Sequence, residues 1–171
     1  MEITETTALI RIGVSLVLGL SIGIERERHK HQAGVRTFTL VCIGSTLAML
    51  VSIYICQQNL NLLNGDPGRI AAQVLTGVGF IGAGLIMQNK DGISGLTTAA
   101  TVFTTAIIGL AAGTGMLLVA TAVTVIVLAV LMLSAVKKYE KTRQTNKISG
   151  KKEDSRKEEE PICEEGWRDD D

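Results

Sequence analysis

The feature that most constrains the fold is residues 70–87, a run of 18 residues without a charged side chain. A run of this length is just long enough to cross the hydrocarbon core of a bilayer as one helix. It also contains four glycines, each of which would cost a helix in water roughly 1 kcal/mol. In a membrane, small residues instead allow neighbouring helix backbones to approach closely. The run is therefore predicted to be a transmembrane helix.

Small residues occupy two sides of this helix. At about 100° per residue, Gln73, Gly77 and Gly84 share one face, and Gly79 and Gly82 lie roughly opposite. A helix of this kind is expected to pack between two others, so we predict that it is the central helix of a bundle. The same glycines spell G-x-G-x-x-G, but the nucleotide-binding motif requires a preceding strand and an acid about 20 residues later. Helix packing is therefore the favoured interpretation.

Four further apolar runs complete the predicted architecture. The formal net charge is zero, but the charged residues are distributed unevenly along the chain. Charged residues gather at 25–36 and from residue 137 onward. We predict an all-α, polytopic membrane protein of one membrane domain, residues 1–136. Its five transmembrane helices should span about residues 8–24, 38–56, 70–87, 96–112 and 116–136. Residues 137–171, with ten basic and eleven acidic side chains, are expected to be a largely disordered tail.

Little in the sequence indicates catalysis. His29 and His31 lie in one predicted loop without further ligands at metal-binding spacing, and Cys42 and Cys56 are too far apart on one helix to form a disulfide. No Ser/His/Asp set or pair of acids suggests an active site. We therefore expect a protein that is not an enzyme and that uses no metal, cofactor or nucleic acid.

Candidate functional residues lie at the helix borders. Glu25 and Arg26 directly follow the first apolar run, where a charge is costly unless it is paired. Arg36 opens the second run about a loop's length later, which places all three groups on the same side of the membrane, where a carboxylate and a guanidinium can pair. Asp66 is expected mainly to cap the third helix, with a role in a site as the alternative, and Gln73 is a polar candidate within that helix.

Two other patterns suggest helix contacts. Gly19 and Gly23 form a G-x-x-x-G pair in the first helix. Thr97, Thr101 and Thr104 share one face of the fourth helix; their hydroxyl groups can bond to their own helix, bond to a neighbour or line a polar path. Packing is favoured over a polar cavity.

The basic residues predict the orientation. With five spans, nine of them, at positions 26–36, 90 and 137–143, lie on one side of the membrane, against Arg69 and Arg11 on the other. By the positive-inside rule, the amino terminus is outside and the carboxyl terminus is cytoplasmic.

Five segments resemble the MgtC/SapB family of bacterial membrane proteins: GIER (23–26), AGVRT (33–37), DP with RIAAQ (66–73), GVGFIGAG (77–84) and GLTTAAT (95–101). Phe103 departs from this pattern, since many members have tryptophan there. Some members also carry a folded cytoplasmic carboxyl-terminal domain, which the short charged tail is not expected to form.

The resemblance implies a multi-pass protein of the bacterial inner membrane that supports growth in low magnesium and, in some pathogens, survival inside macrophages. It also implies regulation of other membrane proteins, such as the ATP synthase. The expected partners are the lipid bilayer and other membrane proteins, either the ATP synthase or a second copy of this chain. A regulator that binds membrane helices is the favoured hypothesis, with Glu25, Arg26 and Arg36 forming the regulatory contact. The alternative is an ion or small-solute transporter or channel that uses Glu25, Asp66, Gln73 and the threonines.

Overall fold

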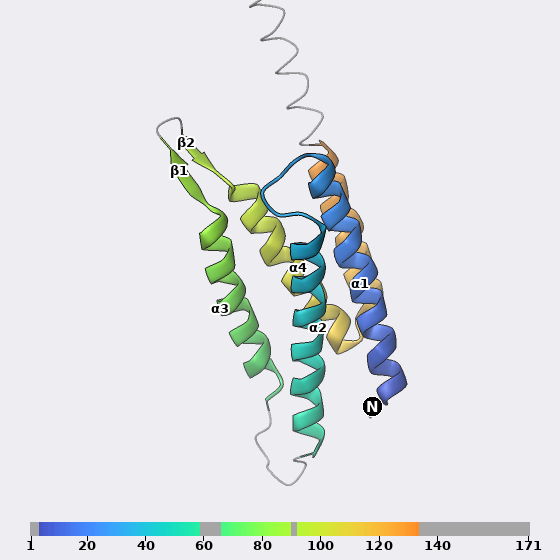
Figure 1. Ribbon diagram of the computed structural model, residues 1–171. Helices are drawn as coiled ribbons and strands as arrows, with labels where there is room; N and C mark the ends of the chain where they lie inside the picture. Colours follow the sequence, from blue (N-terminus) through green and yellow to red (C-terminus); the bar gives the residue numbers. More distant parts are fainter. Residues whose placement is uncertain (1–3, 59–65, 90–91, 134–171) are drawn as a thin grey trace, which may run out of the picture. The chain divides into compact units, whose positions relative to one another are not determined.

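The computed structural model describes residues 4–58, 66–89 and 92–133, which form a bundle of helices with one short hairpin (Figure 1). Contacts divide the chain into two units, Met1–Leu131 and Met132–Asp171. The tail predicted at 137–171 lies outside the described residues.

The bundle consists of α1 (Glu5–Arg28), α2 (Val35–Gln58), α3 (Gly68–Leu85), α4 (Leu96–Thr114) and a fifth helix (Leu117–Leu133). The first four are long and apolar enough to cross a membrane. The predicted all-α, polytopic architecture is therefore confirmed. α1 and α2 extend several residues past the predicted spans, because an apolar run marks only the part of a helix that lies in hydrocarbon.

A short hairpin, β1 (Met87–Asn89) and β2 (Gly92–Ser94), connects α3 to α4, with Met87 opposite Ser94 and Gln88 opposite Ile93. The connection between the two helices therefore contains regular structure that its sequence pattern does not predict. Strands of three residues are too short to show alternation, and the Asp91-Gly92 dipeptide was the available turn signal.

The centre of the bundle is α4, which contacts α1, α2 and α3 and has 61% of its apolar stretch buried. A Cβ atom added at Gly109 would overlap the backbone oxygen of Cys42, and one added at Gly113 would lie 2.7 Å from the Cβ of Met49. The hydroxyl of Thr46 donates to the Gly109 carbonyl at 2.8 Å. The backbones of α2 and α4 therefore touch along a G-x-x-x-G pair that the sequence analysis did not single out.

α1 packs on α2 through the other G-x-x-x-G pair. An added Cβ at Gly19 would lie 2.9 Å from the Cβ of Cys42, and one at Gly23 would lie 2.6 Å from the Cα of Val35. These glycines thus lie at a backbone contact, as their spacing predicts.

α3 lies at the edge of the bundle, so the prediction that it is the central helix was wrong (Figure 1). It packs on α2 and α4 with one side, on which Val78 and Gly82 are buried. Gly82 faces Ala99, but at Gly77, Gly79 and Gly84 an added Cβ would meet no atom within 4 Å. The number of glycines in a helix does not predict whether it is central. A glycine marks a close contact only where a neighbouring helix approaches it, as α2 approaches the glycines of α4.

Candidate functional site

Glu25 and Arg26, at the end of α1, form a buried ion pair. Their side chains are 5% and 3% exposed, and the Arg26 Nε donates to the Glu25 Oε2 at 2.6 Å while Nη2 donates to Oε1 at 3.3 Å. A buried charge is tolerated only when a partner and hydrogen bonds replace its lost hydration. The two-point contact supplies both, so each residue holds the other in place.

His29 extends this pair toward the surface. Its Nδ1 lies 3.0 Å from the backbone oxygen of Glu25 and 3.3 Å from its Oε1. Both neighbours are acceptors, so these contacts assign the ring hydrogen to Nδ1. The imidazole is partly exposed and therefore connects a buried carboxylate with the solvent.

Neighbouring residues hold the loop between α1 and α2. The Glu27 carboxylate accepts from the backbone N–H of Val35 at 3.0 Å and so caps the first turn of α2. At the start of α4, Gly95 has a left-handed φ of 87°, and an added Cβ would overlap the Leu85 oxygen and approach the Gln32 Oε1 at 3.2 Å. The loop, the base of the hairpin and the first turn of α4 therefore meet at this end of the bundle.

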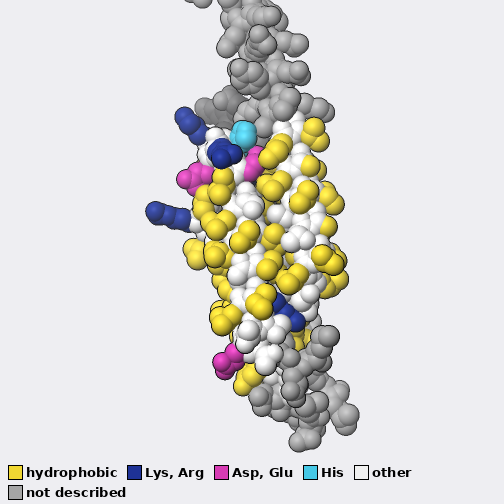
Figure 2. Space-filling view, turned by 90° about the vertical axis from the view of Figure 1, so that its right-hand side faces the viewer, with side chains coloured by type: hydrophobic (Ala, Val, Ile, Leu, Met, Phe, Trp, Pro, Cys, Tyr) yellow, Lys and Arg dark blue, Asp and Glu magenta, His cyan; other side chains and the backbone are white. Residues whose placement is uncertain are grey.

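Of the two guanidinium groups predicted on the same side as Glu25, Arg26 forms the pair, and no pair with Arg36 is found among the described residues. Arg36 is exposed in the first turn of α2, as are Arg28 and Lys30 at the end of α1 and the start of the loop. This end therefore has a neutralised interior and a basic exterior. Figure 2 shows charged side chains gathered toward the ends of one face, with hydrophobic side chains between them.

The opposite end holds the other polar candidates around a pocket of about 400 Å³. Asp66 Oδ1 accepts from the backbone N–H of Gly68, the first residue of α3, at 2.8 Å, although the N-cap residue is Pro67 and not Asp66. The Ser52 hydroxyl donates to the Pro67 oxygen at 2.9 Å. The pocket is lined by Ser52, Ile55, Cys56, Asp66, Arg69, Ile70 and Gln73. The lining of this pocket therefore includes a carboxylate, a guanidinium and an amide.

The threonines of α4 bond to their own helix. The Thr101 hydroxyl donates to the Thr97 oxygen at 2.7 Å, and the Thr104 hydroxyl donates to the Ala100 oxygen at 2.9 Å. Thr97, Thr101 and Thr104 also line a cavity of about 210 Å³ against apolar side chains of the fifth helix. The threonine face therefore both packs against the fifth helix and lines a cavity, and the Thr101 and Thr104 hydroxyls there are already bonded to their own helix.

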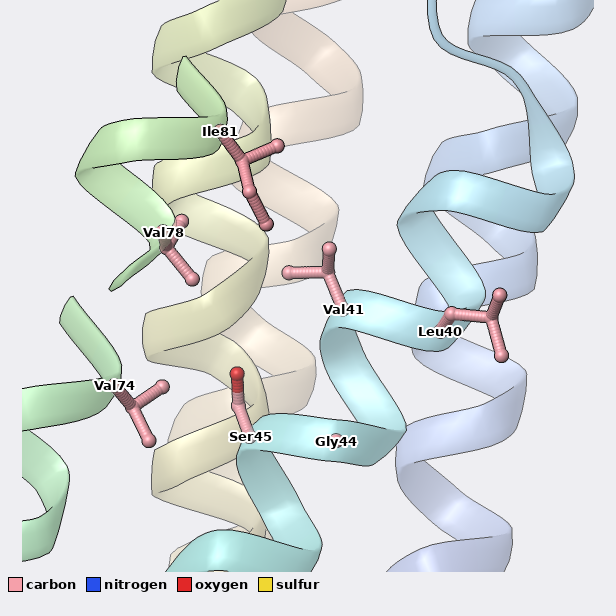
Figure 3. Close-up of a pocket in the computed structure, with 7 residues that line it drawn as sticks. All are labelled: Leu40, Val41, Gly44, Ser45, Val74, Val78 and Ile81. Atoms are coloured by element: carbon pink, nitrogen blue, oxygen red, sulfur yellow. The ribbon is translucent and has the colours of Figure 1, made fainter. Parts of the chain in front are cut away.

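A third cavity, of about 330 Å³, lies between α2 and α3 (Figure 3). Val41 and Ser45 of α2 face Val74 and Val78 of α3 across it. None of its lining residues is charged, so it suits an apolar occupant better than an ion. Among the described residues, no group of three or more His, Cys, Asp or Glu is placed to hold a metal ion.

Arg11 has a role that the sequence analysis did not predict, where it was counted only as a basic residue on the outer side. Its Nη1 donates to the backbone oxygen of Gly113 at 2.7 Å, which is one of the otherwise unpaired carbonyls at the end of α4. The cation also complements the negative end of the helix dipole. The sequence feature that could have indicated this role is the position of Arg11, a charged residue inside the apolar run of α1.

The apolar helices and the border positions of the charged residues define a polytopic membrane protein. The sequence profile of the MgtC family matches residues 12–140, and the chain belongs to this family, which confirms the resemblance seen in the sequence. It is 47% identical over 110 residues to YhiD of Escherichia coli (strain K12), covering 63% of this chain and 51% of YhiD. It is 38% identical over 120 residues to the protein MgtC of Salmonella typhimurium (strain LT2), covering 70% of this chain and 49% of MgtC.

A Haemophilus influenzae protein without an assigned function is 41% identical over 125 residues, which cover 71% of this chain and 52% of that protein. The chain thus spans about half the length of the curated relatives it matches. No solved structure matches it.

Proposed function

We propose that this protein supports bacterial growth when magnesium is scarce by acting on other proteins of the inner membrane, of which the ATP synthase is one candidate. Family membership and the name of the E. coli relative, provisionally a magnesium transporter, support the link to magnesium. The basic end around the buried Glu25–Arg26 pair is the observation that carries the regulatory part. We assign this end to the cytoplasmic side, because basic loops are retained there.

In this proposal the buried pair positions the contact residues and does not itself meet the partner. Glu25 and Arg26 neutralise each other, and together with Glu27 they hold the end of α1 against the start of α2. The exposed cations of that end, Arg28, Lys30 and Arg36, then face the cytoplasm at fixed positions. They are suited to an acidic surface of a membrane-protein partner.

The test removes exposed charge without disturbing the buried pair. The double variant Lys30→Gln/Arg36→Gln should lose most of its support of growth at low magnesium while its abundance stays unchanged. The matched control is Arg69→Gln, an exposed cation at the opposite end of the bundle, which should behave as the unmodified protein. If the double variant supports growth normally, the regulatory contact does not lie at this end.

A transporter is the second candidate, and the pocket with Asp66, Arg69 and Gln73 favours it. Against a route through α4, the Thr101 and Thr104 hydroxyls are bonded to their own helix. Sealed liposomes containing the purified protein separate the two candidates. Magnesium flux above that of empty liposomes, lost in Asp66→Asn, would support the transporter and contradict a purely regulatory role.

A further inference from the structure

The hydropathy and the burial of α3 do not match. Over its 18-residue apolar stretch, α3 has the lowest mean hydropathy of the four long helices, yet it is the least buried, with 11% of that stretch covered against 61% in α4. A helix that faces lipid should be the most apolar of the set, because hydrocarbon offers polar groups no hydrogen-bond partner. The exposed face of α3 contributes to this low value, because it carries the polar side chains of Gln73 and Thr76, which hydrocarbon does not favour.

That face follows a heptad pattern. Gln73, Thr76, Phe80 and Ala83 are all exposed, and their spacing of three and four residues matches the a and d positions of a parallel coiled coil. The Thr76 hydroxyl is bonded to its own helix at 3.1 Å. Gln73 lies about 8 Å from the start of the helix, at 1.5 Å per residue. Its side-chain amide forms no hydrogen bond to another described residue.

Phe80 is the one large knob on this face. Its side chain is 84% exposed, and the positions three and four residues away on either side hold only small residues: Thr76, Gly77, Ala83 and Gly84. At Gly77 and Gly84 there is open space beyond the backbone. A large side chain flanked by small residues makes a helix complementary to an identical helix. The large side chain of each helix, the knob, fits into the space between the small residues of the other.

We propose that α3 packs in parallel against α3 of a second copy of this chain, with Phe80 and Gln73 in successive layers of the contact. An amide both donates and accepts, so two symmetry-related Gln73 side chains satisfy each other without a different partner. Residues 72–85 of α3 carry no charge, so this face offers nothing to an ionic partner. A two-fold axis along the membrane normal relates the two copies.

Cysteine cross-linking in native membranes tests this contact. In a background with Cys42, Cys56 and Cys163 replaced by alanine, Thr76→Cys and Ala83→Cys should each form a disulfide-linked dimer under mild oxidation. The matched control is Leu118→Cys on the fifth helix, where the native leucine is 86% exposed; it should remain monomeric. Reporters that stay monomeric, or that link no more than the control, would overturn the proposal.

Two further variants test the packing. Phe80→Ala, introduced beside Ala83→Cys, should lower the linked fraction by about tenfold at unchanged abundance, because Phe80 is almost fully exposed in the single chain. Gln73→Leu should also lower it, since the amide pair is lost. An unchanged fraction in both variants, or a link to a different protein in place of the dimer, would contradict the proposal. The measurement does not use growth, so its outcome is independent of the regulatory function.

Discussion

Replacing Gly109 by alanine tests the closest helix contact of the bundle. The added Cβ would overlap the backbone oxygen of Cys42 and lie 2.9 Å from the Cβ of Ser45. A backbone atom inside a packed helix cannot move aside as the end of a side chain can, so α2 and α4 must separate. Overpacking of this kind typically costs about 1–3 kcal/mol. We therefore expect Gly109→Ala to lower the free energy of unfolding by about 1–3 kcal/mol relative to a matched Gly→Ala control.

The matched control is Gly13→Ala in α1, because an added Cβ there would meet no atom within 4 Å. Both replacements gain the same helix propensity, about 1 kcal/mol, so their difference isolates the steric cost. The free energies would be measured by reversible unfolding in mixed micelles with increasing SDS, followed by circular dichroism. Equal stability of the two variants would refute the inference that α2 and α4 touch at Gly109.

Three further predictions concern charged groups. Glu25→Leu should lower the stability by about 3–5 kcal/mol because it leaves the buried Arg26 unpaired, whereas Glu25→Leu with Arg26→Met should recover most of the loss in the same assay; an additive double variant would contradict the pairing. Arg11→Ala should cost about 1–3 kcal/mol through the lost bond to the α4 carbonyl, and unchanged unfolding would show that this bond contributes nothing. Lys30→Cys should resist an impermeant thiol reagent in intact cells while Arg69→Cys reacts, in a background without other cysteines; the reverse labelling would invert the topology.

The sequence by itself determined the class of fold. Uncharged runs of membrane-spanning length, separated by charged borders, leave a chain few alternatives to transmembrane helices, because the backbone must satisfy its own hydrogen bonds in hydrocarbon. The motifs at 23–26, 33–37 and 77–84 were specific enough to indicate the family. A hydrogen bond from Asp66 near the start of the third helix was also predictable, since an Asp side chain readily accepts from the backbone N–H two residues later. The fold class, the family motifs and the Asp66 hydrogen bond could be predicted because each depends on residues that are close together in the sequence.

Only the tertiary structure decided which helix lies at the centre and which charges meet. Gly77, Gly79 and Gly84 favoured a central α3, but α2 approaches Gly109 and Gly113 of α4. A glycine permits close contact without choosing the helix that makes it. Likewise, Glu25 had two guanidinium groups within plausible reach, and the rotation of α1 against α2 buried Arg26 with it while Arg36 stayed exposed. Both outcomes depend on the relative rotation of whole helices, which is set by the packing of all their side chains together.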